Sequence, residues 1–234
     1  MMLGLIQRRK GLLPLYSQME AAGREVVRGY VKQVNSSVFT EEEMVESLVR
    51  NGAVKIGHFR LLFGLHSDAF LQCAAFLGNH ENLTKVAKEL AAKSREWHPD
   101  AVLGPLTIDA IFTLSVAEQL GVEHVLFADM NKSGRPVGLM PGLQLTKGER
   151  VLIATDMMTT GTGVKNLQEI VANAGATSVG VVAFAQRITP KNEGHVVTEL
   201  PTKTLLTLEM SHWEKRECPL CRDSVPIVNA LDIS

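Results

Sequence analysis

One stretch constrains the fold of this chain more than any other: residues 151–164, with the sequence VLIATDMMTTGTGV. Its first four residues are apolar and predict a short buried strand, and an amphipathic helical pattern begins at Val164. A turn rich in glycine and threonine between a strand and a helix exposes unpaired backbone N–H groups at the positive end of the helix dipole, which stabilises an anion. The stretch therefore predicts a strand, an acidic tip, a phosphate-binding loop and a helix.

The polar residues of this stretch suit a phosphorylated ligand. Asp156 follows the strand, where it could meet a ribose diol or a Mg²⁺ ion. The spacing is neither that of a P-loop, which needs Lys and then Ser or Thr after its second glycine, nor that of a GxGxxG motif. A strand–turn–helix connection with incidental threonines is the alternative. The residues predicted to hold the phosphate are Thr159, Thr160, Gly161, Thr162 and Gly163.

The composition excludes several classes of protein. The chain has 234 residues, of which 45% are hydrophobic and 21% charged, enough for one sizeable core. Its net charge of −1 and pI of about 6.7 recruit neither nucleic acid nor an anionic membrane, so we expect neither as a partner. No apolar run approaches the roughly 20 residues of a membrane span. Basic residues follow the apolar ones at the start of the chain, the reverse of a secretory signal, and we expect a cytoplasmic protein.

Strand and helix patterns alternate along most of the chain. Helices are predicted from Thr40, an N-cap with Glu43 at the capping-box position, and over residues 81–97 and 109–120; strands are predicted over 101–104, 125–128, 177–185 and 201–209. This order predicts an α/β fold with a doubly wound, mostly parallel sheet and a ligand at the carboxyl ends of its strands.

Three regions follow from these patterns. Residues 1–37 form a predicted helical extension, in which the apolar spacing is clearest at Val26, Val27, Tyr30 and Val31. It either packs on the core, which we favour, or forms a solvated amphipathic appendage; it could also lengthen a dimer contact. Residues 38–215 form the main domain, and residues 216–234 a C-terminal tail.

The cysteines do not form a disulfide framework, because the chain has only three. Cys218 and Cys221 form a CxxC pair in the tail, and His212 could be a third ligand of a zinc ion. A reduced structural motif is the other interpretation. We favour that one, because a single CxxC is a weak signal for zinc.

Residues 151–164 closely resemble the ribose-5-phosphate-binding signature of type I phosphoribosyltransferases. That signature has four apolar residues, two acidic residues, two apolar residues and then Thr-Thr-Gly-x-Thr or a near variant. In this chain Thr155 occupies the first acidic position and Asp156 the second. The resemblance implies that Asp156 meets the ribose hydroxyls or, indirectly, a Mg²⁺ ion, and that residues 159–163 hold the 5′-phosphate.

A second run resembles the hood segment of orotate phosphoribosyltransferases, which folds over the pyrimidine. We place this hood over residues 53–75; a plain hairpin with core aromatic residues is the alternative. The Cys-Pro-Leu-Cys tail also resembles one subgroup of the same family. The matching hood residues are Gly57, His58, Phe59, Gly64, Leu65, His66, Ser67, Asp68, Phe70, Leu71 and Gln72.

The resemblance implies further site residues. Arg187 matches the arginine that holds the carboxylate or ring oxygens of orotate, a task that suits a planar guanidinium, and Phe70 lies in the hood. The resemblance implies that Asp156 is a catalytic residue. On the loop that closes over the pyrophosphate in the family, two cations remain in this chain, Lys132 and Arg135, and they are the other predicted catalytic residues. Of the turn that binds pyrophosphate in the family, Gly104 and Pro105 remain.

The predicted function is transfer of ribose 5-phosphate from 5-phosphoribosyl pyrophosphate to a nitrogen heterocycle, with Mg²⁺, in nucleotide biosynthesis. We expect a homodimer. Departures from the family pattern leave two alternatives open: a divergent enzyme with another donor, acceptor or leaving group, and a non-catalytic nucleotide-binding regulatory protein. The departures are Leu106, Thr107, Ile108, Asp109, Met130, Met140, Pro141 and Thr155.

Overall fold

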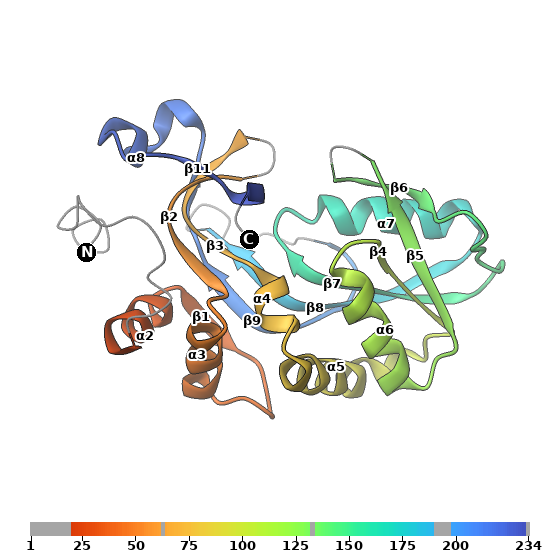
Figure 1. Cartoon of the computed structure of the whole chain (residues 1–234). Helices are drawn as coiled ribbons and strands as arrows, with labels where there is room; N and C mark the ends of the chain where they lie inside the picture. Colours follow the sequence, from red (N-terminus) through yellow and green to blue (C-terminus); the bar gives the residue numbers. More distant parts are fainter. Residues whose placement is uncertain (1–19, 62–63, 132–133, 190–197, 233–234) are drawn as a thin grey trace.

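The main sheet of the protein has the strand order β1-β9-β8-β7-β4-β5-β6 in a computed structural model that describes residues 20–61, 64–131, 134–189 and 198–232. The five central strands run parallel, and the edge strands β1 and β6 pair antiparallel (Figure 1). This confirms the doubly wound, mostly parallel α/β fold. The strands are β1 (Val31–Val34), β4 (Ala101–Pro105), β5 (His124–Met130), β6 (Pro136–Leu139), β7 (Arg150–Met158), β8 (Thr177–Ile188) and β9 (Thr202–Glu209).

Helices cover both faces of this sheet. α5 (His80–Ser94) and α6 (Asp109–Leu120) pack on one face, and α7 (Thr162–Asn173) lies on the other (Figure 1). Successive residues of β7 enter opposite cores, because side chains alternate along a strand: Leu152 packs with α5 and α6, and Ile153 packs with α7. This two-sided burial explains the continuous apolar run that opens β7.

Local capping signals in the sequence are confirmed. α3 (Glu41–Arg50) begins with a capping box, in which the Thr40 side chain accepts from the Glu43 N–H and the Glu43 carboxylate accepts from the Thr40 N–H. α6 ends at Gly121, whose φ of 75° lies in the left-handed region that glycine favours. α5 ends earlier than expected, at Ser94, and continues as the 3₁₀ turn η3 (Arg95–Trp97).

The N-terminal prediction is partly wrong. α2 (Glu20–Arg28) carries Val26 and the buried Val27, but the helix does not continue to Val31. Val31 instead starts β1, an edge strand paired antiparallel with β9, and Tyr30 is buried between the two elements. Pairing with a distant strand has overridden the local helical pattern. Residues 1–19 of the predicted extension lie outside the described part.

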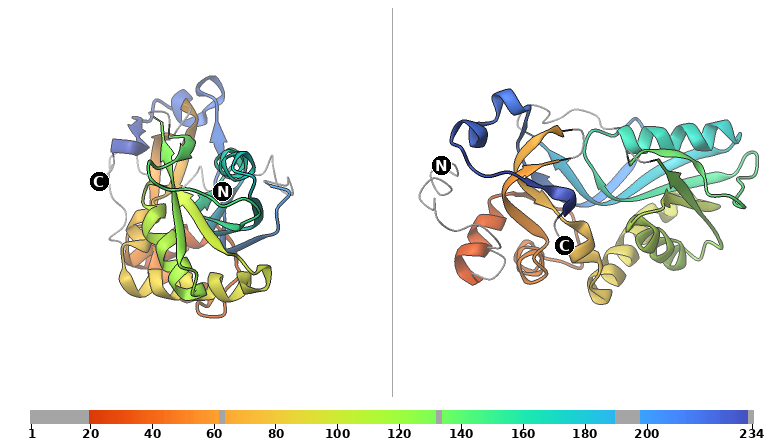
Figure 2. Two further views of the ribbon diagram at one scale, coloured as in Figure 1. Left: turned by 90° about the vertical axis from the view of Figure 1, so that its right-hand side faces the viewer. Right: turned by 45° about the horizontal axis from the view of Figure 1, so that its top comes forward.

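A second, smaller sheet stands beside the main sheet, in the order β10-β3-β2-β11. β2 and β3 form the antiparallel hairpin expected for the hood, and the C-terminal segment supplies both edge strands. Figure 2 shows this segment, in dark blue, running across the orange hairpin. The elements are β2 (Val54–Arg60), β3 (His66–Leu71), α4 (Cys73–Leu77), β10 (His212–Trp213), η4 (Lys215–Glu217), α8 (Pro219–Arg222), β11 (Val228–Asn229) and η5 (Ala230–Asp232).

Among the described helices, none combines the length and the apolar character that crossing a membrane requires.

Candidate active site

The turn between β7 and α7, residues 159–163, has the geometry of an anion-binding loop; we call it the phosphate loop. Gly161 is the N-cap of α7 with a φ of 78°, a left-handed conformation that a residue with a side chain rarely adopts. The hydroxyls of Thr160 and Thr162 lie 3.0 Å apart, and both residues are exposed. Hydroxyl groups therefore surround the N-terminus of a 12-residue helix, where unpaired N–H groups attract an anion.

Asp156 lies within β7 rather than after it, because β7 stays paired with β8 as far as Met158 and Gln186. A second carboxylate, that of Asp109 at the start of α6, contacts its backbone. One Asp109 carboxylate oxygen accepts from the Thr155 hydroxyl at 2.8 Å and from the Asp156 backbone N–H at 2.5 Å. The other accepts from the Thr107 hydroxyl. Burial, followed by the negative charge of Asp109, raises the pKa of Asp156 well above its usual range.

This contact was missed by the sequence analysis. Thr155 stands where the family signature has an acid, and its hydroxyl is bonded to a carboxylate that arrives from α6 instead. Asp109 is buried and directed at β7. A carboxylate beside Asp156 is thus present, although residue 155 does not supply it.

The base of the hood reaches the same place. The thiol of Cys73, which begins α4 directly after the hood hairpin, lies 3.9 Å from the backbone oxygen of Asp156. Phe70, on β3, packs edge-to-face against Phe59, with ring centroids 4.9 Å apart. The structure therefore brings the hood hairpin to the carboxyl end of β7.

Arg187 lies near the end of β8, one residue beyond the pairing of Gln186 with Met158, so it stands beside the start of the phosphate loop. It is partly buried, and burial lowers the pKa of its guanidinium. Within the described part of the chain, no hydrogen bond or ion pair engages this guanidinium. A partly buried cation of this kind suits an anionic or carbonyl-bearing ligand.

Gly104 and Pro105 are buried at the end of β4. A Cβ atom on Gly104 would overlap the Thr113 hydroxyl of α6 and lie 2.8 Å from the Ala154 backbone oxygen. The glycine thus allows α6 to pack closely on β4 and β7. A role of these two residues in substrate binding remains a prediction.

The expected loop or ribbon over residues 129–143 is a ribbon, because β6 returns antiparallel along β5. Arg135 is exposed at its turn, and its backbone N–H donates to the Asn131 side chain at 3.0 Å. Lys132 lies outside the described residues. Their predicted catalytic roles remain predictions.

A second group of chemically active side chains lies at the other end of the hood, and it corrects the predicted zinc ligands. Cys218 and Cys221 gather with His58 and His66, whereas His212 is not a member of this group. The donor atoms of the four residues all lie within 4.8 Å of one another. We call these four residues the His–Cys group. The sequence contained the signal, because both histidines lie in the hood match, but it did not show that the tail returns to them.

Comparisons with known proteins place this geometry in context. A family model described as "Phosphoribosyl transferase domain" matches residues 75–217. The chain is 34% identical over 189 residues to an orotate phosphoribosyltransferase of Caldanaerobacter subterraneus subsp. tengcongensis, covering 80% of this chain and 95% of that protein. It is 33% identical over 184 residues to an orotate phosphoribosyltransferase of Chlorobium phaeobacteroides, covering 79% and 92%.

Two solved structures agree with this chain on the fold. The orotate phosphoribosyltransferase of Aeropyrum pernix matches with a TM-score of 0.55 and 22% identity, covering 69% of this chain and 92% of that one. The UMP synthase of Leishmania donovani matches with a TM-score of 0.52 and 18% identity, covering 69% of this chain and 34% of that one. The phosphate loop and every strand of the main sheet except β1 fall inside the span of the family model.

Proposed function

The chain belongs to the phosphoribosyltransferase family, and from this premise we propose that it transfers ribose 5-phosphate from 5-phosphoribosyl pyrophosphate to a ring nitrogen of orotate. The reaction serves nucleotide biosynthesis. The observation that carries the proposal is the phosphate loop at the N-terminus of α7, with Asp156 on the strand that leads into it. The names of the relatives supply the acceptor.

Different residues of the site bind different parts of the substrates. In our proposal the phosphate loop holds the 5′-phosphate through backbone N–H groups and the threonine hydroxyls. Asp156 faces the ribose hydroxyls. Arg187, whose guanidinium has no ion pair within the described residues, binds the carboxylate of the acceptor in a bidentate fashion. Phe70 contacts the acceptor from the hood.

The reaction exchanges one bond for another at the first carbon of the ribose. The bond from this carbon to the pyrophosphate oxygen breaks, and its electron pair leaves with pyrophosphate. A ring nitrogen of orotate loses its proton to solvent and forms the new bond to this carbon. Positive charge develops on the ribose as the bond breaks, and the Asp156 carboxylate stabilises it. Burial, followed by the negative charge of Asp109, raises the pKa of Asp156, so a positive charge at this place is favourable.

The residues present fit Mg²⁺, because the ion prefers oxygen ligands and often binds through one or two carboxylates together with substrate phosphates. Asp156 would hold it indirectly, and bound Mg²⁺ would neutralise charge on the leaving pyrophosphate. In the same proposal Lys132 and Arg135 contact the pyrophosphate from the β5–β6 ribbon, beside Gly104 and Pro105. We also propose that the enzyme is a cytoplasmic homodimer.

One observation favours a second candidate, a transferase with another leaving group. The turn between β4 and α6 presents Leu106, with 42% of its surface exposed, where the family binds pyrophosphate. An apolar side chain there offers the anion no hydrogen bond. Asp109, another departure from the family pattern in this region, has its carboxylate hydrogen-bonded to β7.

Titration calorimetry and pyrophosphate release test the proposal on the full chain. We expect binding of ribose 5-phosphate, and release of pyrophosphate from 5-phosphoribosyl pyrophosphate only when orotate and Mg²⁺ are present. Binding without release would contradict the orotate reaction and favour the second candidate or a non-catalytic nucleotide-binding protein. Failure to bind ribose 5-phosphate would refute the assignment of the phosphate loop.

A further inference from the structure

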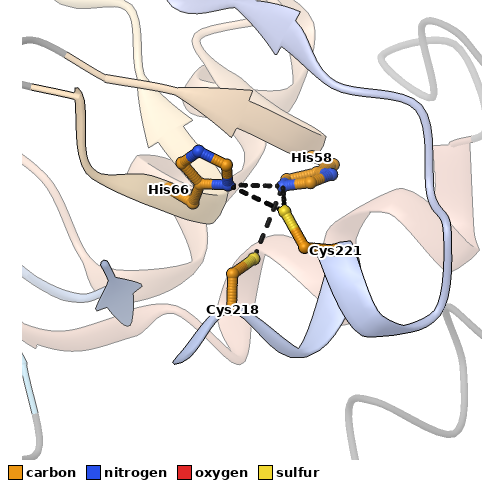
Figure 3. Close-up of side chains that lie close together, drawn as sticks. All are labelled: His58, His66, Cys218 and Cys221. Atoms are coloured by element: carbon orange, nitrogen blue, oxygen red, sulfur yellow. Dashed lines mark hydrogen bonds between the residues drawn. The ribbon is translucent and has the colours of Figure 1, made fainter. Parts of the chain in front are cut away.

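The His–Cys group joins two segments that are far apart in the chain. His58 and His66 lie on β2 and β3 of the hood hairpin, and Cys218 and Cys221 flank the start of α8 in the C-terminal segment (Figure 3). His58, His66 and Cys218 are buried, and Cys221 is partly buried. Four groups that ligate metals through nitrogen or sulfur therefore converge near the turn of the hood hairpin. The opposite end of the hairpin leads to Cys73, which contacts Asp156.

A hydrogen bond fixes which nitrogen of His58 faces the group. Its Nδ1 donates to the backbone oxygen of Val225 at 2.8 Å, because a carbonyl oxygen can only accept. In a neutral imidazole the other nitrogen, Nε2, then carries a lone pair. Nε2 lies 3.4 Å from the Cys218 sulfur and 3.8 Å from the Cys221 sulfur. Metal-binding histidines are typically oriented by such an outer hydrogen bond.

Four of the six distances between the donor atoms are close to the edges of a tetrahedron around zinc, and the other two are no longer than 4.8 Å. With Zn–N about 2.05 Å and Zn–S about 2.3 Å, two nitrogens lie about 3.3 Å apart, a nitrogen and a sulfur about 3.6 Å, and two sulfurs about 3.8 Å. His58 Nε2 and His66 Nδ1 are 3.0 Å apart, and the Cys221 sulfur lies 3.3 Å from His66 Nδ1. The group is therefore already close to the size that zinc requires.

We propose that His58, His66, Cys218 and Cys221 bind one zinc ion. Two thiolates and two imidazoles at tetrahedral spacing select zinc among the common divalent ions. All four positions are filled by protein, so the site is structural and offers none to a substrate. A disulfide between the two cysteines is the competing state; both are free thiols in the structure.

The zinc ion would fasten the C-terminal segment to the hood. Without it, strand pairing between the segment and the hood sheet is short, since β10 pairs with β3 over two residues and β11 with β2 over two residues. A metal bound to all four residues closes a loop between positions 58 and 218, which are 160 residues apart. Closing so long a loop removes much of the conformational freedom of the unfolded chain.

The test uses the full chain freed of any polyhistidine tag, purified with zinc and then dialysed without chelator. Elemental analysis should find one zinc ion per chain, and X-ray absorption at the zinc edge should show two sulfur and two nitrogen ligands. Cys221→Ser and His66→Asn should each lose most of the zinc. Cys73→Ser and His80→Asn are matched controls, because neither residue belongs to the group, and both should keep it.

Results on the wild-type protein decide the matter even where a variant fails to fold. Absence of stoichiometric zinc after purification with zinc would overturn the proposal, and so would an absorption spectrum of oxygen ligands. Thiol titration in denaturant without reductant adds a third test: a Cys218–Cys221 disulfide would leave only Cys73 reactive and would overturn the proposal. Three reactive thiols once chelator is added would support it.

Discussion

The phosphate loop and the His–Cys group differ in how the chain builds them. The polar groups of the phosphate loop come from consecutive residues, 159–163, so one stretch of sequence is enough to predict its chemistry. The His–Cys group draws them from two segments, the hairpin at residues 54–71 and the tail at 218–221. The first site is visible before the fold is known. The second exists only once the tail has returned to the hood sheet.

The two sites also differ in what they do. The phosphate loop leaves the hydroxyl-bearing residues Thr160 and Thr162 exposed, whereas the His–Cys group is largely buried. We therefore expect changes at the first site to affect turnover and changes at the second to affect stability.

Loss of the Asp156 carboxylate should have the largest effect. Asp156→Asn keeps the shape of the side chain but removes the charge that, in our proposal, stabilises the positive charge developing on the ribose. Removal of one such electrostatic group typically lowers kcat about 10²- to 10³-fold, or about 3–4 kcal/mol. Steady-state pyrophosphate release measures it, with Glu169→Gln as the control, because Glu169 is exposed on α7. The zinc content should not change.

Equal loss of activity in the Glu169→Gln control would mean that charge anywhere near α7 matters and that Asp156 has no special part. A twofold effect or less in Asp156→Asn would remove it from the catalytic residues altogether.

Breaking the His–Cys group should have the next largest effect, on stability alone. We expect Cys221→Ser to lower the free energy of unfolding by about 3 kcal/mol, since loss of a structural metal is one of the few changes that destabilise a domain so strongly. Urea denaturation of wild type and variant, both dialysed with zinc, gives the difference. The affinity for ribose 5-phosphate should be unchanged while the protein is folded.

A variant that is fully stable but no longer binds ribose 5-phosphate would reverse the comparison. It would show that the hood and the phosphate loop form one functional unit.

A buried carboxylate outside both sites supplies the reference for plain destabilisation. Glu89, on α5, accepts from the Ser36 hydroxyl at 2.5 Å and the Ser37 N–H at 2.6 Å, and pairs with Lys93 at 3.1 Å. Burial alone would raise the pKa of Glu89, but these partners outweigh it and the pKa is lowered. We expect Glu89→Gln to cost about 2 kcal/mol at pH 7, because charged hydrogen bonds are lost.

The sign of its pH dependence follows from the lowered pKa. Ionised Glu89 contributes stability above the ordinary glutamate pKa of about 4.3, and this contribution disappears as the pH falls through the lower pKa of the folded state. Wild type and Glu89→Gln should therefore converge in acid. Urea denaturation across this range measures it, and a constant difference would contradict the assignment. The variant should keep both its zinc and its turnover at pH 7, which would show that destabilisation alone abolishes neither.

The same contrast explains what could be predicted from the sequence. Local signals succeeded where neighbouring residues decide the structure, as at the Thr40 capping box, the Gly121 cap and the apolar run of β7. They failed where a partner arrives from afar. Val31 continued a helical pattern but pairs with Leu208, and His212 seemed nearer to the cysteines than His58, which is 160 residues from Cys218. Sequence spacing carries no information about such contacts until the topology is fixed.

The smallest effect on turnover should come from a change at Asp109, a residue distant in the sequence that contacts the strand leading into the phosphate loop. Asp109 lies 46 residues from Thr155, yet its carboxylate accepts from the Thr155 hydroxyl and the Asp156 N–H. It thus contacts the strand that carries Asp156, and we expect it to act by positioning that strand. We expect Asp109→Asn to lower kcat about fivefold, or about 1 kcal/mol, with little change in the KM for 5-phosphoribosyl pyrophosphate, because the hydrogen bonds that this side chain accepts from β7 are weakened.

A double-mutant cycle distinguishes positioning from general disruption. Thr155→Val removes the hydroxyl that donates to Asp109 and keeps the size of the side chain. If Asp109 acts through this bond, the two changes should lower kcat less together than the sum of their separate effects, since contacting residues are coupled. Independent, additive effects would show that the carboxylate from α6 does not support Asp156, and that Thr155 is a plain substitution in the phosphoribosyltransferase signature. Coupling would show that turnover at the phosphate loop and the strand before it also depends on one side chain that is distant in the sequence.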